Sequence, residues 1–451
     1  MIEPNRRSAR RSSLAALFLA FQALLISVQG HAENWPQWRG PFFNGSTTEK
    51  GLPVQWSKTE NMVWVAPLPG YSSATPAIWD DCVFVSSPDE QKNLILICLD
   101  SKSGKVRWRK AVAGGDRQQG LNNMASPSPV TDGKRVFSLF ATGDVAAFDF
   151  SGQELWKRDL GKEYGRFANM WIYGSSPMLY QDKLYVQVVQ HNPRPESYTH
   201  ALDDKPERES FLLCLDPQTG TNLWRHVRPT DAVEESQEAY STPIPYVGKQ
   251  GEEILVVGGD YVTAHSPDTG VELWRCGGLN VRHEHFWRIV PSVVVAEGMI
   301  IACGPKRDPV LGIKDGGRGL VTETNIAWQF KESPSDCVTP LSYQQKLFVL
   351  DGDRQVMTCL NPQTGAKEWQ GNLGVKEIFR ASTTGADGKI YCVSENGTVI
   401  VLEAGNDFKI LSTIRMGEAP VRSSIAVAHG ELFIRTAQNL YCVRNPGRGE
   451  P

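Results

Sequence analysis

A short pattern recurs along this chain and constrains its fold more than any other feature of the sequence. The pattern places Asp, Asn or Ser before a Gly-containing turn and a Trp after it; its five clear copies begin at Leu99, Phe148, Leu215, His265 and Leu360. In each copy a mostly apolar stretch runs into the turn, which is the sequence signal of a β-hairpin. Repetition of this kind predicts a fold assembled from repeated β units.

Each repeat unit also opens in the same way, with a small residue, often followed by Pro, before a strand. The eight openings begin at Ser72, Ser126, Ser175, Ser241, Val290, Val338, Ala381 and Ser423. With the hairpin that follows, each unit has four strands. Seven tryptophans mark the outer strands, 41 to 68 residues apart, at Trp64, Trp108, Trp156, Trp224, Trp274, Trp328 and Trp369. Four-strand units at this spacing are typical of propeller blades.

Eight openings predict an all-β, eight-bladed propeller of four-stranded antiparallel blades. After the last opening the chain has only two further strands, whereas residues 62–65 are a strand with no unit before them. We therefore expect this N-terminal strand to complete the last blade as its outer strand, which removes free sheet edges. The unit at 379–411 lacks the Trp, so seven blades plus a degenerate one is the alternative.

The first 32 residues have the composition of an export signal. Four arginines lie between positions 6 and 11, and an apolar run from Leu14 to Val28 leads to small residues near position 32. We expect residues 1–32 to be removed on export to the periplasm or cell envelope, with an uncleaved signal anchor as the alternative. The remaining chain divides into an entry segment at 33–61, the propeller at 62–444 and a tail at 445–451. No later stretch approaches the roughly 18 apolar residues of a membrane span.

Charge and cysteine usage exclude several classes of function. Without residues 1–32 the chain has 43 basic and 49 acidic residues, a net charge of −6 that disfavours nucleic acid as a partner. Its nine cysteines include no Cys-x-x-Cys pair, the usual signature of zinc, dithiol and haem sites. Cys98, Cys214, Cys359 and Cys442 occupy one equivalent place in the repeat, so we expect small buried strand residues there.

The repeats resemble those of the pyrroloquinoline-quinone-like (PQQ-like) β-propeller family over nearly the whole chain after the signal. The stretch from Trp35 to Pro41, Trp-Pro-Gln-Trp-Arg-Gly-Pro, is similar to the entry segment of exported members. The resemblance implies that the seven repeat tryptophans are structural and pack between neighbouring blades. It implies little about function, because one fold hosts several activities.

Two activities are implied by this resemblance. Quinoprotein dehydrogenases of the family use PQQ, a calcium ion and a catalytic Asp, and usually carry two adjacent cysteines, which this chain lacks. Cofactor-free members resemble the scaffold of the outer-membrane assembly machinery, which is typically a lipoprotein, whereas the first cysteine here is Cys82. We expect a monomeric, non-catalytic binding or assembly scaffold with an envelope protein partner and no cofactor. The alternative is a PQQ-dependent oxidoreductase that binds PQQ and calcium.

Ligands of propellers bind where the loops before the inner strands meet at the axis. The candidate channel residues at these positions are Asn123, Asn169, Trp171, Tyr240, Arg288, Asp336, Arg380 and Arg422. The three arginines offer paired donors to one anion. The favoured alternative is that they pair with Asp336, Glu377 or Glu418 and line a solvated channel. An unrelated enzyme that uses this arginine-lined channel is a third class, although no catalytic residue is assigned.

Three other segments are weaker candidates for a site. His283 and His285 could bind a metal, but no third ligand is evident and Trp287 stands where a zinc motif needs His, so a surface pair is expected. The charged insertion at 190–210 is predicted to be a solvated surface loop. The Gly-rich stretch at 312–319 lacks the Gly-Lys-Ser/Thr ending of a phosphate loop, so a wide hairpin turn is expected.

Overall fold

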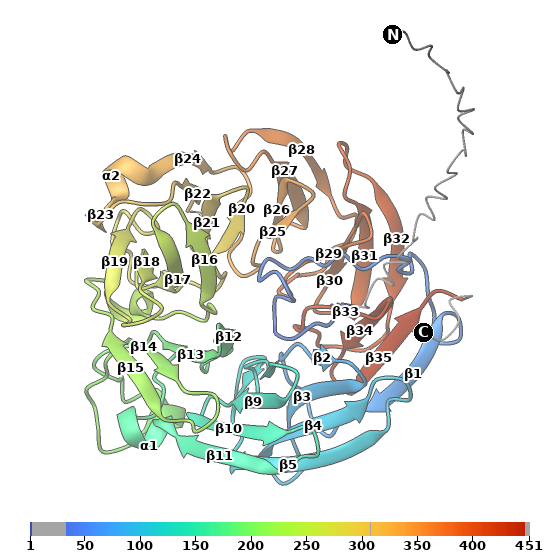
Figure 1. Cartoon of the computed structure of the whole chain (residues 1–451), viewed down its shortest axis with the longest axis horizontal. Helices are drawn as coiled ribbons and strands as arrows, with labels where there is room; N and C mark the ends of the chain where they lie inside the picture. Colours follow the sequence, from blue (N-terminus) through green and yellow to red (C-terminus); the bar gives the residue numbers. More distant parts are fainter. Residues whose placement is uncertain (2–32, 307, 447–451) are drawn as a thin grey trace. The chain divides into compact units, whose positions relative to one another are not determined.

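The computed structural model describes Met1 and residues 33–306 and 308–446. Residues 33–306 and 308–446 form an eight-bladed β-propeller, which confirms the predicted fold and the predicted number of blades (Figure 1). Apart from Met1, the predicted export signal lies outside the described residues. No helix in the described part of the chain is long and apolar enough to cross a membrane.

Each blade is built on four antiparallel strands, and in blades 1 to 7 these follow one another along the chain from the axis outward. Blades 1 to 3 comprise β2 (Ala77–Trp79), β3 (Cys82–Pro88), β4 (Asn93–Asp100) and β5 (Val106–Gly114); β8 (Val130–Thr131), β9 (Arg135–Leu139), β10 (Asp144–Asp149) and β11 (Glu154–Asp159); and β12 (Met178–Tyr180), β13 (Lys183–Val188), β14 (Phe211–Leu215) and β15 (Asn222–Val227). Blades 4 and 5 comprise β16 (Ile244–Gly248), β17 (Gly251–Gly258), β18 (Tyr261–His265) and β19 (Glu272–Cys276); and β20 (Val294–Ala296), β21 (Met299–Cys303), β22 (Val310–Ile313) and β24 (Ile326–Phe330).

The remaining blades follow the same plan. Blades 6 and 7 comprise β25 (Leu341–Tyr343), β26 (Lys346–Asp351), β27 (Val356–Leu360) and β28 (Lys367–Asn372); and β29 (Thr384–Ala386), β30 (Lys389–Val393), β31 (Thr398–Glu403) and β32 (Ile410–Arg415). Blade 8 comprises β33 (Ala426–Ala428), β34 (Glu431–Arg435), β35 (Asn439–Arg444) and the N-terminal β1 (Met62–Pro67). The short elements between blades are β6 (Gln118–Gln119), β7 (Asn122–Asn123), α1 (Leu160–Tyr164), η1 (Thr199–Ala201), η2 (Glu234–Gln237), β23 (Gly319–Leu320) and α2 (Thr322–Asn325).

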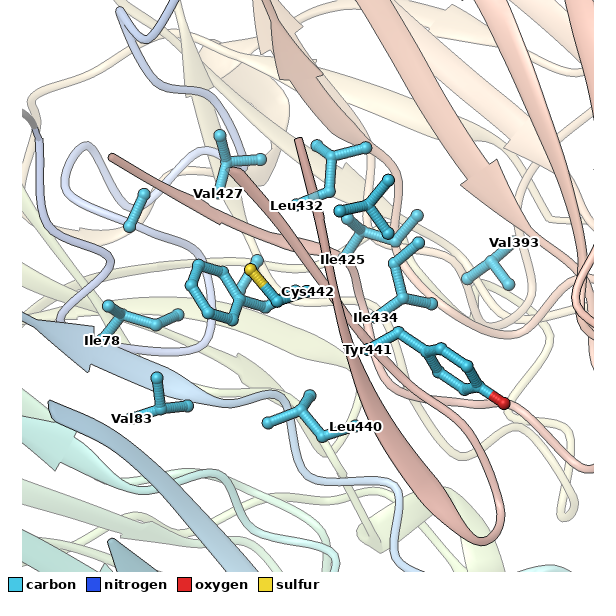
Figure 2. Packing of buried hydrophobic residues seen from close by; sticks show 14 of the residues in the cluster. Ile78, Val83, Val393, Ile425, Val427, Leu432, Ile434, Leu440, Tyr441 and Cys442 are labelled. Atoms are coloured by element: carbon cyan, nitrogen blue, oxygen red, sulfur yellow. The ribbon is translucent and has the colours of Figure 1, made fainter. Parts of the chain in front are cut away.

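The ring closes as the sequence predicts, because β1 pairs antiparallel with β35 and so supplies the outer strand of blade 8 (Figure 1). Apolar side chains from three blades meet at this closure. Figure 2 shows Leu432 and Ile434 of β34 among them, together with Ile78 of blade 1 and Val393 of blade 7. First and last segments of the propeller therefore share one buried core.

A β-bulge recurs at the same place in the third and fourth strands of the blades. In blade 1, Cys98 lies opposite Trp108 and Leu99 opposite Val106, so that Arg107 is the extra residue. The residue opposite each repeat Trp is small: Cys98, Ala147, Cys214, Ala264, Gly312, Cys359 and Cys442. This pairing explains the repeated small residues, because they leave space for the indole beside them. The four cysteines predicted to be buried strand residues are buried.

Each repeat Trp except one reaches the turn of the following blade. The indole Nε1 of Trp156, for example, donates to the carbonyl oxygen of Pro217 at 2.9 Å, and its ring lies against Gly220. Trp274 differs: it is fully buried, and its Nε1 donates to Glu253 of its own blade at 3.1 Å. The reason lies in blade 5, where a long connection replaces the short turn.

The Gly-rich stretch predicted to be a wide hairpin turn is that connection. It joins β22 to β24, which are antiparallel neighbours, and is therefore a wide turn as expected. Within it, β23 leaves blade 5 and pairs in parallel with the outer strand β19 of blade 4. Blade 4 consequently has five strands, and its outer edge is covered.

Candidate functional site

The main candidate site is a cavity of about 440 Å³ at the propeller axis. It is lined by residues from all eight connections that lead into the inner strands: Ser73, Asn122, Trp171, Tyr240, Arg288, Cys337, Arg380 and Arg422. Five of the residues proposed from the sequence, Trp171, Tyr240, Arg288, Arg380 and Arg422, thus meet in one cavity. The other three proposed residues, Asn123, Asn169 and Asp336, do not line the cavity. Asn122 lines it in place of Asn123, and Cys337 lines it in place of Asp336.

The two asparagines proposed from the sequence hold the loops of the scaffold. Asn123 is buried and its Nδ2 donates to the carbonyl oxygen of Tyr71 at 2.6 Å. The Nδ2 of Asn169, also buried, donates to the carbonyl oxygens of Val189 and Ala239 at 2.9 and 3.2 Å. An asparagine buried among backbone groups that need partners is a positioning residue for the loops.

A ring of hydroxyl groups surrounds the axis below these loops, with one Ser or Thr from each blade. At seven of the eight steps around this ring, all except the step from Ser382 to Ser424, the backbone N–H of one member donates to the side-chain oxygen of the next, over distances of 2.8 to 3.1 Å. The members, in order, are Thr75, Ser128, Ser176, Thr242, Ser292, Thr339, Ser382 and Ser424, and the bond between Ser424 and Thr75 joins the last blade to the first. Six of the eight, all but Thr75 and Ser292, line the cavity.

The three cavity arginines are each bound to a carboxylate. Arg288 lies 3.2 Å from Asp336, Arg380 lies 2.6 Å from Asp353, and Arg422 lies 2.6 Å from Glu395. The predicted pairing with Asp336 is therefore found. Burial acts to lower the pKa of Arg288, but nearby anionic groups, Asp336 foremost, outweigh it and raise that pKa above its ordinary value.

The other two predicted partners were wrong. Glu377 accepts hydrogen bonds from Ser394 and Thr398, and Glu418 accepts from Asn439 and from the hydroxyl of Tyr441. Both carboxylates thus serve strands and turns of the outer scaffold. The true partners, Asp353 and Glu395, follow the second strands of blades 6 and 7 and reach the arginines only once the blades are packed side by side.

One wall of the cavity is organised around the fully buried Glu238. Its Oε2 accepts a hydrogen bond from the hydroxyl of Tyr240 at 2.9 Å, and that hydroxyl accepts the backbone N–H of Trp171 at 3.0 Å. Burial, reinforced by Glu238, raises the pKa of Tyr240 well above its usual value, so its hydroxyl stays protonated and donates. The indole Nε1 of Trp171 donates to Glu235 at 2.9 Å.

The entry segment forms the opposite side of the cavity, where Trp38 is one of the lining residues. Arg39 is buried and donates to the carbonyl oxygens of Pro340 and Thr383, which directly follow two members of the hydroxyl ring. The entry segment therefore contacts the chain one residue beyond the hydroxyl ring in these two blades. Trp35, also buried, exchanges backbone hydrogen bonds with Ile78 of β2.

The insertion at 190–210 differs from the solvated loop that its composition predicts. Tyr198 and Ala201 are buried, and the hydroxyl of Tyr198 donates to Oε1 of Glu238 at 2.6 Å. Arg208 is buried with its guanidinium 2.7 Å from Asp203. Paired charges and one aromatic side chain allow a charged segment to pack against the cavity wall.

Metal-binding chemistry has little support in the described residues. His283 and His285 are both exposed. No group of three or more His, Cys, Asp or Glu side chains within residues 33–306 and 308–446 is arranged to hold a metal ion. Cys337 lines the cavity, but burial raises the pKa of its thiol to about 12, so it is not a thiolate nucleophile at neutral pH.

The fold is shared with solved structures of both kinds that the sequence resembles. The chain is 14% identical to BamB from Moraxella catarrhalis, with a TM-score of 0.58 over 84% of this chain and 99% of that one. It is 11% identical to the quinohemoprotein alcohol dehydrogenase from Comamonas testosteroni, with a TM-score of 0.65 over 92% and 82% of the two chains. A europium-containing methanol dehydrogenase gives 10% identity and a TM-score of 0.63 over 91% and 89%.

Sequence comparison gives a more specific result. No curated protein matches the chain significantly. The family profile described as outer membrane protein assembly factor BamB, which is built on PQQ-type repeats, matches residues 44–194 and 208–445. The break in the match falls within the insertion described above. The resemblance to PQQ-like repeats is confirmed, and the chain belongs to the propeller family described as outer membrane protein assembly factor BamB.

Proposed function

We propose that this protein is an exported, non-catalytic scaffold that binds a protein partner in the cell envelope. The observation that carries the proposal is that the charged groups at the axis neutralise one another. Arg288, Arg380 and Arg422 are each held by a carboxylate at 2.6 to 3.2 Å. Such pairs orient the arginine side chains, and the described lining of the cavity contains no Asp, Glu, His or Lys that could act as a general base. The family match supports the same function.

The surface around the cavity mouth has the composition of a protein-binding site. Five large apolar side chains are exposed on the connections that lead into the inner strands or, for Leu202, on the insertion at 190–210: Trp171, Leu202, Val281, Phe286 and Ile378. We call this surface the loop face. Val281 is 77% exposed and Phe286 is 56% exposed, on the connection that also carries Arg288. Aromatic and aliphatic side chains exposed in this way serve as anchors in protein interfaces.

Site-specific photo-crosslinking in cells tests the loop face. A photoreactive phenylalanine analogue at position 286 is expected to give an adduct with one discrete envelope protein. The matched control is position 247, because Val247 is 67% exposed on β16, away from the cavity lining. A partner captured equally from both positions, or from neither, contradicts the proposed binding surface.

A PQQ-dependent oxidoreductase is the second candidate, favoured by the shared fold of the two dehydrogenases. PQQ carries three carboxylates, whereas the three cavity arginines already have carboxylate partners. A donor set for calcium is also missing from the described residues. The residues present therefore do not fit the cofactor pair well.

Calorimetric titration with PQQ and calcium, followed by a dye-linked alcohol oxidation assay, separates the two candidates. Neither heat of binding nor turnover is expected. Saturable binding at about micromolar concentration together with turnover would overturn the scaffold proposal.

A further inference from the structure

The geometry points to a ligand for the axial cavity that is independent of the protein partner: a neutral polyhydroxylated molecule, such as a short oligosaccharide. The cavity volume of about 440 Å³ is within the range of small-molecule sites. Charge, hydrogen-bonding capacity and aromatic surface each favour this chemical class, and each rests on different residues.

The charge of the cavity disfavours a polyanion. The guanidinium groups of Arg288, Arg380 and Arg422 face three carboxylates, and Arg288 has a second one nearby, since its Nε lies 3.7 Å from Glu235. The described lining of the cavity carries these three arginines and no Asp or Glu, so the carboxylates balance the guanidinium charges from outside the lining. A ligand with several negative charges would have to displace these carboxylates or lie beside them. A neutral ligand carries no such electrostatic cost.

The hydroxyl ring offers hydrogen bonds of the kind that sugar hydroxyls need. Each ring oxygen that accepts a backbone N–H retains its own O–H as a donor. Within the described residues, none of the six cavity-lining ring hydroxyls donates to a protein acceptor. The hydroxyls of Ser128, Ser176 and Thr242 are examples, and Ser382 and Ser424 continue the row in blades 7 and 8. Hydroxyl groups both donate and accept, so they match a polyol better than a ligand with only acceptors.

Trp171 supplies an apolar surface in a fixed orientation. Its indole Nε1 donates to Glu235, and its backbone N–H donates to the hydroxyl of Tyr240. Its carbonyl oxygen accepts a hydrogen bond from Nδ2 of Asn122 at 2.9 Å. Its ring packs beside Gly120, where an added Cβ would lie 3.5 Å from Cζ3. The residue lines the cavity and remains 39% exposed. The C–H groups of a pyranose ring are complementary to the electron-rich face of an indole.

Titration calorimetry with neutral oligosaccharides tests the inference on a chain that begins at Glu33. The probes are maltotriose, cellotriose and diacetylchitobiose, with citrate as a small tricarboxylate for comparison. At least one saccharide is expected to bind saturably with Kd below about 1 mM, and citrate is expected to bind at least about tenfold more weakly. No saccharide binding, or tighter binding of citrate, would overturn the inference.

Variants assign the binding to this cavity. Trp171→Ala is expected to weaken saccharide binding at least about tenfold, and Trp171→Phe, which keeps an aromatic face, is expected to weaken it less. Phe286→Ala is the control, because Phe286 is exposed on the same face but does not line the cavity. Equal affinity in Trp171→Ala and the unchanged chain would contradict the assignment. Phe286→Ala is expected to leave saccharide affinity unchanged, whereas the scaffold proposal is tested by crosslinking from position 286, so failure of one proposal is distinguishable from failure of the other.

Discussion

The contact between a Trp of one blade and a Gly of the next is the basic unit of this fold at the residue scale. Gly104, Gly152, Gly220, Gly270 and Gly365 lie against Trp64, Trp108, Trp156, Trp224 and Trp328, and all five have positive φ. The Gly therefore has two functions, since it adopts the turn conformation and leaves room for the indole. Because both residues belong to the repeat motif, this contact could be inferred from sequence.

The substitution Gly220→Ala separates these two functions. Gly220 has φ +72°, and an added Cβ would lie 2.6 Å from Cε3 of Trp156. We expect a loss of about 3 kcal/mol or more in the free energy of unfolding, from the turn conformation and the steric clash together. Gly298→Ala is the control, because Gly298 has φ +78° with no atom within 4 Å of the added Cβ.

Urea unfolding measures both Gly substitutions. The control is expected to lose about 1 kcal/mol through backbone strain alone. Equal losses of stability in the two variants would show that packing of the Trp156 indole does not require a glycine at position 220.

At the element scale, the strands were predictable and the insertion at 190–210 was not. Strand positions follow from apolar stretches and turn residues that lie next to one another in sequence. The insertion has the composition of a solvated loop, yet it packs through Tyr198 onto Glu238, a residue 40 positions away. A partner so distant leaves no local signal in the insertion itself.

The substitution Tyr198→Phe tests whether this hydrogen bond holds the insertion in place. Removing the hydroxyl leaves an oxygen of the buried Glu238 without that donor, and we expect a loss of about 1–3 kcal/mol in stability. Tyr180→Phe is the matched control, because the Tyr180 hydroxyl lies 3.3 Å from Glu252 at an exposed site. Its loss should stay within about 0.5 kcal/mol.

Chemical denaturation of these two Tyr variants gives the comparison. Limited proteolysis adds a local readout, since Tyr198→Phe should increase cleavage within 190–210 but not elsewhere. The same stability for both variants, with unchanged cleavage, would contradict the role given to Tyr198.

At the scale of the whole propeller, β1 closes the ring. Without it, β35 would present an unpaired strand edge, which is a template for association with other chains. The closure was predictable because the last opening is followed by too few strands for a blade, whereas residues 62–65 are a strand with no opening before them. Blade 8 thus depends on a segment whose residues pair with β35 residues more than 370 positions later in the chain.

Three chains that begin at different residues distinguish the contribution of β1 to stability from that of the entry segment. A chain that begins at Leu68 lacks β1, one that begins at Met62 keeps β1 without the entry segment, and one that begins at Glu33 keeps both. We expect the shortest chain to lose at least about 5 °C in Tm relative to the chain from Met62. We also expect it to form oligomers through the open edge.

Light scattering after size-exclusion chromatography and thermal unfolding measure these outcomes. Monomeric behaviour and an unchanged Tm in the chain from Leu68 would show that the ring does not need its N-terminal strand.

The sequence by itself determined the repeat, the eight blades, the closure by residues 62–65 and five residues of the cavity. These follow from local patterns, because hairpins, turns and repeat spacing are written into contiguous residues. Tertiary structure alone decided that Asp353 and Glu395 pair with Arg380 and Arg422, and that eight hydroxyls form a ring at the axis. Each of these contacts joins residues from different parts of the chain, 27 positions apart or more, that meet only after the blades pack. Their chemistry therefore belongs to the closed propeller rather than to any single repeat.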